Sequence, residues 1–141
     1  MKELHQLTAA MMLRGPASPA AIQQAEARLG VCLPPDYTEF LRTHNGGEGP
    51  IGDKGYGVLF AVEELPKTQE NYSELDHFAG WVIFGSDGGG EGWVFAEDGF
   101  VLVVPWLGNK EDALPQGTFT EVLRRVGAGT TFDAPSAGAA T

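Results

Sequence analysis

Glycine is distributed very unevenly along this chain, and the distribution limits which folds the chain can adopt. Fourteen of the 20 glycines lie between Gly46 and Gly108. Glycine weakens helices, and it is the usual residue of tight turns and of close backbone approaches. We therefore predict that residues 46–108 form strands joined by turns, and we expect helices on either side of this region.

Within residues 46–108, four segments are rich in valine, phenylalanine and tryptophan, which favours β-strands. They are Gly57–Val62, Trp81–Gly85, Gly92–Ala96 and Phe100–Trp106. Asp98-Gly99 lies between the last two and is typical of a hairpin turn. A short helix is expected over residues 67–76.

Amphipathic patterns predict helices outside the glycine-rich region. Leu4, Leu7 and Met11 share one face of a first helix that ends near Gly15. A second helix has Ser18 as its N-cap and ends at Gly30, and a third begins at Pro34-Pro35 and stops at Asn45-Gly46.

A last helix begins at Thr118, which with Glu121 forms a capping box, and it ends at Gly127. Residues 127–141 contain too little apolar mass to offset the entropy of ordering, so we predict a flexible tail there. A chain of 141 residues is expected to form a single domain.

The charge of the chain indicates what kind of partner it can bind. With a formal net charge of −10, it repels the phosphate backbone of nucleic acid, so nucleic acid is not an expected partner. The same field attracts a basic protein and speeds its encounter.

Cysteine and hydropathy indicate a compartment. Cys32 is the only cysteine, which excludes an intramolecular disulfide and favours a reducing compartment, and we interpret its side chain as a small buried hydrophobe. The longest apolar run near the N-terminus, "AAMML", is too short for a signal peptide or a membrane span, so we expect a cytoplasmic protein without a membrane partner.

The stretch "FGSDGGGEGW" over residues 84–93 is the strongest candidate site, because three consecutive glycines lie between Asp87 and Glu91. Bare backbone lets a partner approach closely, and the two carboxylates accept hydrogen bonds from lysine or arginine. Trp93 follows Glu91-Gly92, and its ring is suited to a cation–π contact with an arginine side chain. The alternative is a tight turn with solvated carboxylates.

Two patterns resemble cofactor-binding or metal-binding motifs, but neither has the flanking secondary structure that its motif requires. "GEGPIG" at residues 47–52 matches a dinucleotide-binding pattern, but it follows a helix where that motif must precede one. Asp87, Glu91 and Asp98 have partial calcium-loop spacing, but their flanks are predicted strands and an EF-hand requires helices. We expect no cofactor and no metal.

An enzyme would have to use its carboxylates. Glycosidase-type chemistry needs two carboxyl groups at a defined separation, and Asp87, Glu91, Glu97 and Asp98 are the candidates. The three histidines lack metal-ligand spacing. We expect no catalytic residue and no enzyme, and a carboxylate-dependent hydrolase remains the less favoured alternative.

Three motifs, taken together, resemble the SUKH superfamily, the group with the Smi/Knr-type domain found in fungal cell-wall regulators and many bacterial proteins. The first is "ARLGVCLPPDY" followed by "TEFLRTHNGG", the second is "IFGSDGGGEGWVF", and the third is a strand followed by a helix that begins at Phe119. The resemblance covers residues 18–126, which leaves 1–17 as an N-terminal helix extension and 127–141 as the tail.

The resemblance implies an α+β fold with a curved, mainly antiparallel sheet and helices packed on one side. It also implies a function in protein recognition, since similar bacterial members act as immunity proteins that neutralise toxins, frequently nucleases or deaminases. The family has no shared catalytic set, and its motif positions, Tyr37 and Gly85 among them, are interpreted as architectural.

These observations lead to one functional hypothesis: a protein-binding immunity protein that neutralises a basic, nuclease-like toxin. A nuclease site must bind phosphate, so an acidic blocker imitates the charge of its substrate. The alternative is a regulatory scaffold without a toxin partner, and the sequence leaves the oligomeric state open. The residues predicted to bind the partner are Asn45, Glu48, Asp53, Asp87, Glu91 and Trp93.

Overall fold

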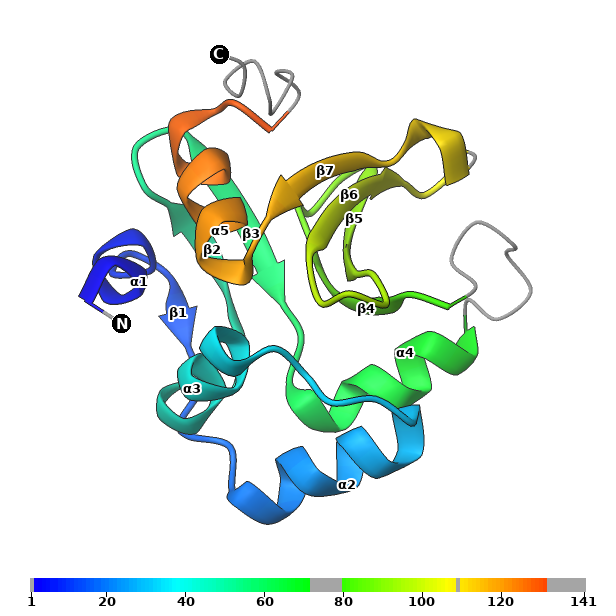
Figure 1. Cartoon of the computed structure of the whole chain (residues 1–141). Coiled ribbons are helices and arrows are strands. Elements are labelled where there is room, and N and C mark those ends of the chain that lie inside the picture. Colours follow the sequence, from blue (N-terminus) through cyan, green and yellow to red (C-terminus); the bar gives the residue numbers. More distant parts are fainter. Residues whose placement is uncertain (1, 72–79, 109, 132–141) are drawn as a thin grey trace.

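In the part of the chain that the structure describes, the fold is built on one antiparallel sheet of seven strands that follow each other in chain order. The computed structural model describes residues 2–71, 80–108 and 110–131. Each strand pairs with its neighbour in the sequence, and Figure 1 shows β4 to β7 curving strongly away from β2 and β3. The strands are β1 (Met12–Leu13), β2 (Gly47–Ile51), β3 (Gly55–Leu59), β4 (Val82–Ser86), β5 (Glu91–Phe95), β6 (Val101–Pro105) and β7 (Leu114–Gly117).

Helices cover one face of this sheet. They are α1 (Lys2–Leu7), α2 (Pro19–Leu29), α3 (Pro35–Thr43), α4 (Leu65–Asn71) and α5 (Phe119–Ala128), with short 3-10 turns at η1 (Val62–Glu64) and η3 (Lys110–Asp112). Helix α5 packs on β2, β3 and β7, α1 and α3 pack on α5, and α2 packs beside α4 (Figure 1). The predicted single-domain α+β fold with a curved antiparallel sheet is confirmed.

Both ends of α2 and the start of α5 coincide with the predicted capping residues. The Ser18 hydroxyl oxygen accepts a hydrogen bond from the backbone N–H of Ala21 at 3.1 Å, and α2 ends at Gly30 with a left-handed φ of 74°. At α5, Thr118 and Glu121 exchange hydrogen bonds of 3.1 and 3.0 Å in the predicted capping box.

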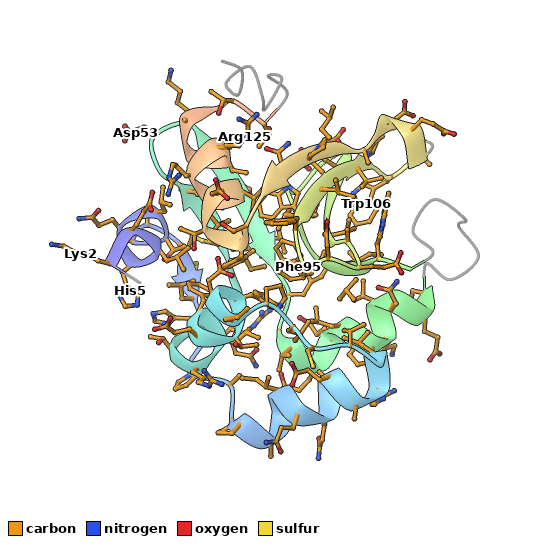
Figure 2. The ribbon with its side chains drawn as sticks, viewed as in Figure 1. Lys2, His5, Asp53, Phe95, Trp106 and Arg125 are labelled. Carbon is orange, nitrogen blue, oxygen red and sulfur yellow. The ribbon has the colours of Figure 1, made fainter. Side chains whose placement is uncertain are left out.

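Aromatic rings from the helices and the sheet meet in the core. Tyr37 of α3 lies 4.9 Å from Phe95 and 5.0 Å from Phe119 between ring centroids, and Phe84 stacks on Phe95 at 4.2 Å. All four side chains are buried, and Figure 2 shows Phe95 pointing into the space between the sheet and the helices. Such ring pairs stabilise a core beyond their area alone, which agrees with the architectural interpretation of Tyr37.

The predicted first helix is too long. Helix α1 ends at Leu7, and Met12 and Leu13, just beyond the predicted apolar stripe, form the edge strand β1 opposite Glu48 and Gly47. Pairing with a distant strand therefore overrides local helix periodicity. The approach of β1 to β2 requires glycine, because a Cβ at Gly47 would lie 2.3 Å from the Met12 carbonyl oxygen.

Besides β1, two more strands were not predicted, and several boundaries differ. Strand β2 lies in the glycine-rich "GEGPI", β7 contains Pro115, and β3 begins two residues before its predicted start. Helix α4 begins at Leu65, and the remainder of the predicted 67–76 helix, from residue 72, lies outside the described residues.

At the C-terminal end, residues 127 and 128 belong to α5 and were wrongly assigned to the tail. Residues 132–141 of the predicted tail are outside the described residues. Cys32 is exposed, which corrects the prediction that it is buried, because the neighbouring Leu33 occupies the core position of this loop.

Candidate protein-binding surface

The outer face of β1, β2 and β3, opposite the helices, carries a row of outward side chains. Along β2, Glu48 and Pro50 are exposed while the alternate residues are buried. The register places Met12 opposite Glu48, Glu48 opposite Val58, and Pro50 opposite Tyr56. Because paired residues point to the same face of a sheet, these five side chains form one surface.

This surface is hollowed and partly apolar. A groove of about 510 Å³, called here the sheet groove, is lined by Met12, Arg14, Glu48, Pro50, Tyr56 and Val58, together with neighbouring backbone. Met12 is 82% exposed and Tyr56 is 45% exposed. Contiguous exposed apolar side chains with a polar border are typical of protein interaction sites.

The segment Ser86–Glu91 that joins β4 to β5 is a tightly hydrogen-bonded turn, called here the glycine loop. Oδ1 of Asp87 accepts from the backbone N–H groups of Gly89 at 2.8 Å and Glu91 at 3.1 Å. The Ser86 hydroxyl accepts from Gly88 N–H at 3.0 Å and donates to the Glu91 carbonyl at 2.9 Å. The loop thus fixes the Asp87 side chain and uses only one of its two oxygens.

A smaller pocket of about 230 Å³ lies between the glycine loop, the start of β3 and the end of α5. This loop pocket is lined by Lys54, Tyr56, Asp87, Glu91 and parts of Trp93, Val103, Val126, Gly129 and Thr131. Burial, and then the charge of the Asp87 carboxylate, raise the pKa of Glu91 above its usual value. The carboxyl end of α5 adds partial negative charge, so the pocket favours a cation.

The structure brings four of the six predicted partner-binding residues to this region. Asp87, Glu91 and Trp93 line the loop pocket, and Glu48 lines the sheet groove. Asp53 is exposed at the turn between β2 and β3, where Figure 2 shows it projecting from the molecule.

The side chain of Asn45, just after the end of α3, makes two structural hydrogen bonds to η1. Its side-chain amide donates to Oε1 of Glu63 at 2.7 Å, and its Oδ1 accepts from the backbone N–H of Val62 at 2.8 Å. Both hydrogen bonds join the end of α3 to η1. Asn45 lines neither the sheet groove nor the loop pocket.

Trp93 is a core residue, which corrects its prediction as an aromatic anchor for a partner. Its side chain is 1% exposed, and its ring fills the space beside Gly57, where a Cβ would lie 2.6 Å from Cη2. Tyr56 is the exposed aromatic residue of this region instead. Tyr56 was not among the predicted partner-binding residues. The predicted strand began at Gly57, although alternation along "GYGVL" places Tyr56 and Val58 on one face.

Within the part of the chain that the structure describes, no helix has the length and apolar character needed to cross a lipid bilayer. Across the same described ranges, no three or more histidine, cysteine, aspartate or glutamate side chains are grouped so as to hold a metal ion.

The geometry defines a single-domain α+β protein whose antiparallel sheet is covered by helices on one face and has an exposed groove on the other. Residues 16–125 match the SMI1 / KNR4 family (SUKH-1), and the chain belongs to this family. It is also similar to "Uncharacterized protein YnaB" of Bacillus subtilis (strain 168), with 32% identity over 104 residues, 72% of this chain and 69% of that protein. The resemblance inferred from the sequence motifs is confirmed.

Proposed function

We propose that this chain is an immunity-type protein that binds and neutralises a basic bacterial toxin in the cytoplasm, and that it acts by binding rather than by catalysis. Membership of the SUKH-1 family supports a role in protein interaction. The observation that carries the proposal is the exposed sheet groove of about 510 Å³ beside the carboxylates of the glycine loop.

Electrostatics supports a basic partner. The chain carries a net charge of −10, and Glu48, Asp87 and Glu91 lie on or beside the proposed surface. A toxin that acts on nucleic acid needs a cationic site for phosphate, and an acidic protein is drawn to that site from a distance. The apolar side chains of the groove then slow dissociation by excluding water from the contact.

The experiment begins with partners captured from a lysate of the source organism on immobilised protein, at low and then at moderate salt. Each basic polypeptide recovered is expressed in a test bacterium with and without this chain. The proposal predicts that one such polypeptide stops growth and that co-expression of this chain restores it. Partners that have no effect on growth would instead favour a regulatory scaffold.

A matched pair of variants controls for net charge. Asp87→Asn/Glu91→Gln removes two carboxylates from the loop pocket, whereas Glu39→Gln/Glu97→Gln removes two exposed ones from α3 and from the turn between β5 and β6. Protection should fall with the first pair and persist with the second. Equal protection by both variants would mean that the glycine loop does not contact the toxin.

A further inference from the structure

We propose that the sheet groove and the loop pocket are two halves of one docking site, and that a single segment of the partner fills both. The segment places an apolar side chain in the groove and a lysine or arginine side chain in the loop pocket. This inference rests on the proposed function only in taking the partner to be a protein.

Tyr56 joins the two halves. Tyr56 is a lining residue of both the sheet groove and the loop pocket. Its hydroxyl donates to Oε2 of Glu48 at 2.9 Å, and a Cβ built on Gly88 would lie 3.4 Å from Cδ1 and Cε1 of its ring. The ring therefore lies between Glu48 and the glycine loop, at the residue that the sheet groove and the loop pocket have in common.

The sheet groove fits an apolar side chain. Met12, Pro50 and Val58 supply apolar surface, and Met12 is 82% exposed. Methionine is flexible and polarisable, so it adapts to side chains of different shape. Burial of these exposed groups under a partner is favourable because apolar area leaves water.

The loop pocket fits a cation. The lining of the loop pocket includes two carboxylates, Asp87 and Glu91, and one ammonium group, Lys54, and none of the described ion pairs joins that ammonium to either carboxylate. A second cation relieves the repulsion between the carboxylates, and the Tyr56 ring adds a cation–π contact. Lys54 repels a bound cation because it has the same charge. Since it balances one of the two carboxylates, the pocket is suited to one further basic side chain.

The test uses a phage library of random short peptides, selected on the immobilised full-length chain. Three proteins are compared: the wild type, Asp87→Asn/Glu91→Gln, and Met12→Ser/Val58→Thr, each with a circular dichroism spectrum to establish folding. The wild type should enrich peptides that contain both a basic and an apolar residue. The first variant should lose the selection for the basic residue alone, and the second should lose the selection for the apolar residue alone.

One selected peptide is then measured quantitatively. Replacement of its arginine by citrulline, which has a similar shape and no charge, should weaken binding to the wild type about tenfold and binding to Asp87→Asn/Glu91→Gln by less than about twofold. Lys54→Gln should bind the arginine peptide severalfold more tightly. This gain of affinity cannot arise from a loss of folding.

The proposal is overturned if no peptide is enriched over a blank surface, if enriched peptides lack basic residues, or if citrulline weakens binding equally to both proteins. The growth-protection assay is independent of these results. Protection without the peptide pattern would leave the immunity function intact and place its contact on another surface. The peptide pattern without protection would support the docking site and reject the immunity function.

Discussion

Oδ2 of Asp36 accepts two hydrogen bonds from Thr120, one from the backbone N–H and one from the hydroxyl, each at 2.9 Å. These bonds join the first turn of α3 to the first turn of α5, 84 positions apart in the chain. A carboxylate is also favoured beside the amino end of a helix. The acidic residue of the "LPPDY" motif thus fastens two of the helices that cover the sheet.

Removal of this link should destabilise the protein without affecting the exposed sheet face. Asp36→Ala is expected to lower the free energy of unfolding by about 1–3 kcal/mol, because both donors of Thr120 lose a charged acceptor. Asp36→Asn keeps one carbonyl oxygen as an acceptor and should lose less. Urea unfolding followed by circular dichroism measures both, and equal stability of the alanine variant and the wild type would contradict this assignment.

The hydroxyl of Tyr37 has no hydrogen-bond partner within the described part of the chain, although the residue is 1% exposed. Burial also raises the pKa of this phenol. Because a buried unsatisfied hydroxyl is unfavourable, Tyr37→Phe is predicted to keep or raise the free energy of unfolding, by up to about 1 kcal/mol. Tyr37→Ala removes the ring and should cost about 3–5 kcal/mol. A clear loss of stability in the phenylalanine variant would reveal a partner for the hydroxyl.

Gly85, beside the glycine loop, and Gly90, within it, should differ in how well they tolerate replacement by alanine. A Cβ at Gly85 would lie 2.7 Å from the backbone carbonyl oxygen of Val58, whereas a Cβ at Gly90 would meet nothing within 4 Å. Gly85→Ala is therefore expected to cost about 1–3 kcal/mol, and Gly90→Ala should be close to neutral. Thermal unfolding of the two variants provides the comparison, and similar midpoints would show that steric room is not what selects Gly85.

Glu91 should make stability depend on pH. Its raised pKa means that the folded protein binds this proton more tightly than the unfolded chain does. The resulting stabilisation is complete below the ordinary carboxyl pKa of 4.5 and is lost as the pH rises through the raised folded-state value. Glu91→Gln should therefore gain stability over the wild type as the pH increases from about 4 to about 7.

Urea unfolding at several pH values tests this expectation, with Glu39→Gln as the control for a change of one in net charge. If the stability of Glu91→Gln relative to the wild type stays constant or falls as the pH rises, the raised pKa is contradicted.

Local signals in the sequence predicted much of the fold. Capping chemistry at Ser18 and Thr118 depends on residues a few positions apart, and the hairpin at Asp98-Gly99 depends on one turn, so a single sequence is sufficient for them. Strand β1 depends on pairing between Met12 and Glu48, which are distant in the chain. Periodicity within a short window contains no information about that pairing.

The candidate surface was predicted in part. The carboxylates of the glycine loop were recognised because their spacing with the glycines is local. Trp93 was wrongly predicted to be exposed. Its position after the loop does not show that its ring fills the space beside Gly57, which only the three-dimensional structure defines. Tyr56 became visible once the register placed it opposite Pro50 on the outer face.

If an acidic, partly apolar face binds a basic protein, its carboxylates should determine the dissociation constant for the partner recovered from the lysate. It should be measured for the wild type, Asp87→Asn/Glu91→Gln and Glu39→Gln/Glu97→Gln at low and moderate salt. We predict that the loop variant binds on the order of tenfold more weakly at low salt, that the control variant stays within about twofold of the wild type, and that added salt slows association. Equal affinities for the two variants, or an association rate that does not change with salt, would contradict the binding of a basic protein by this face.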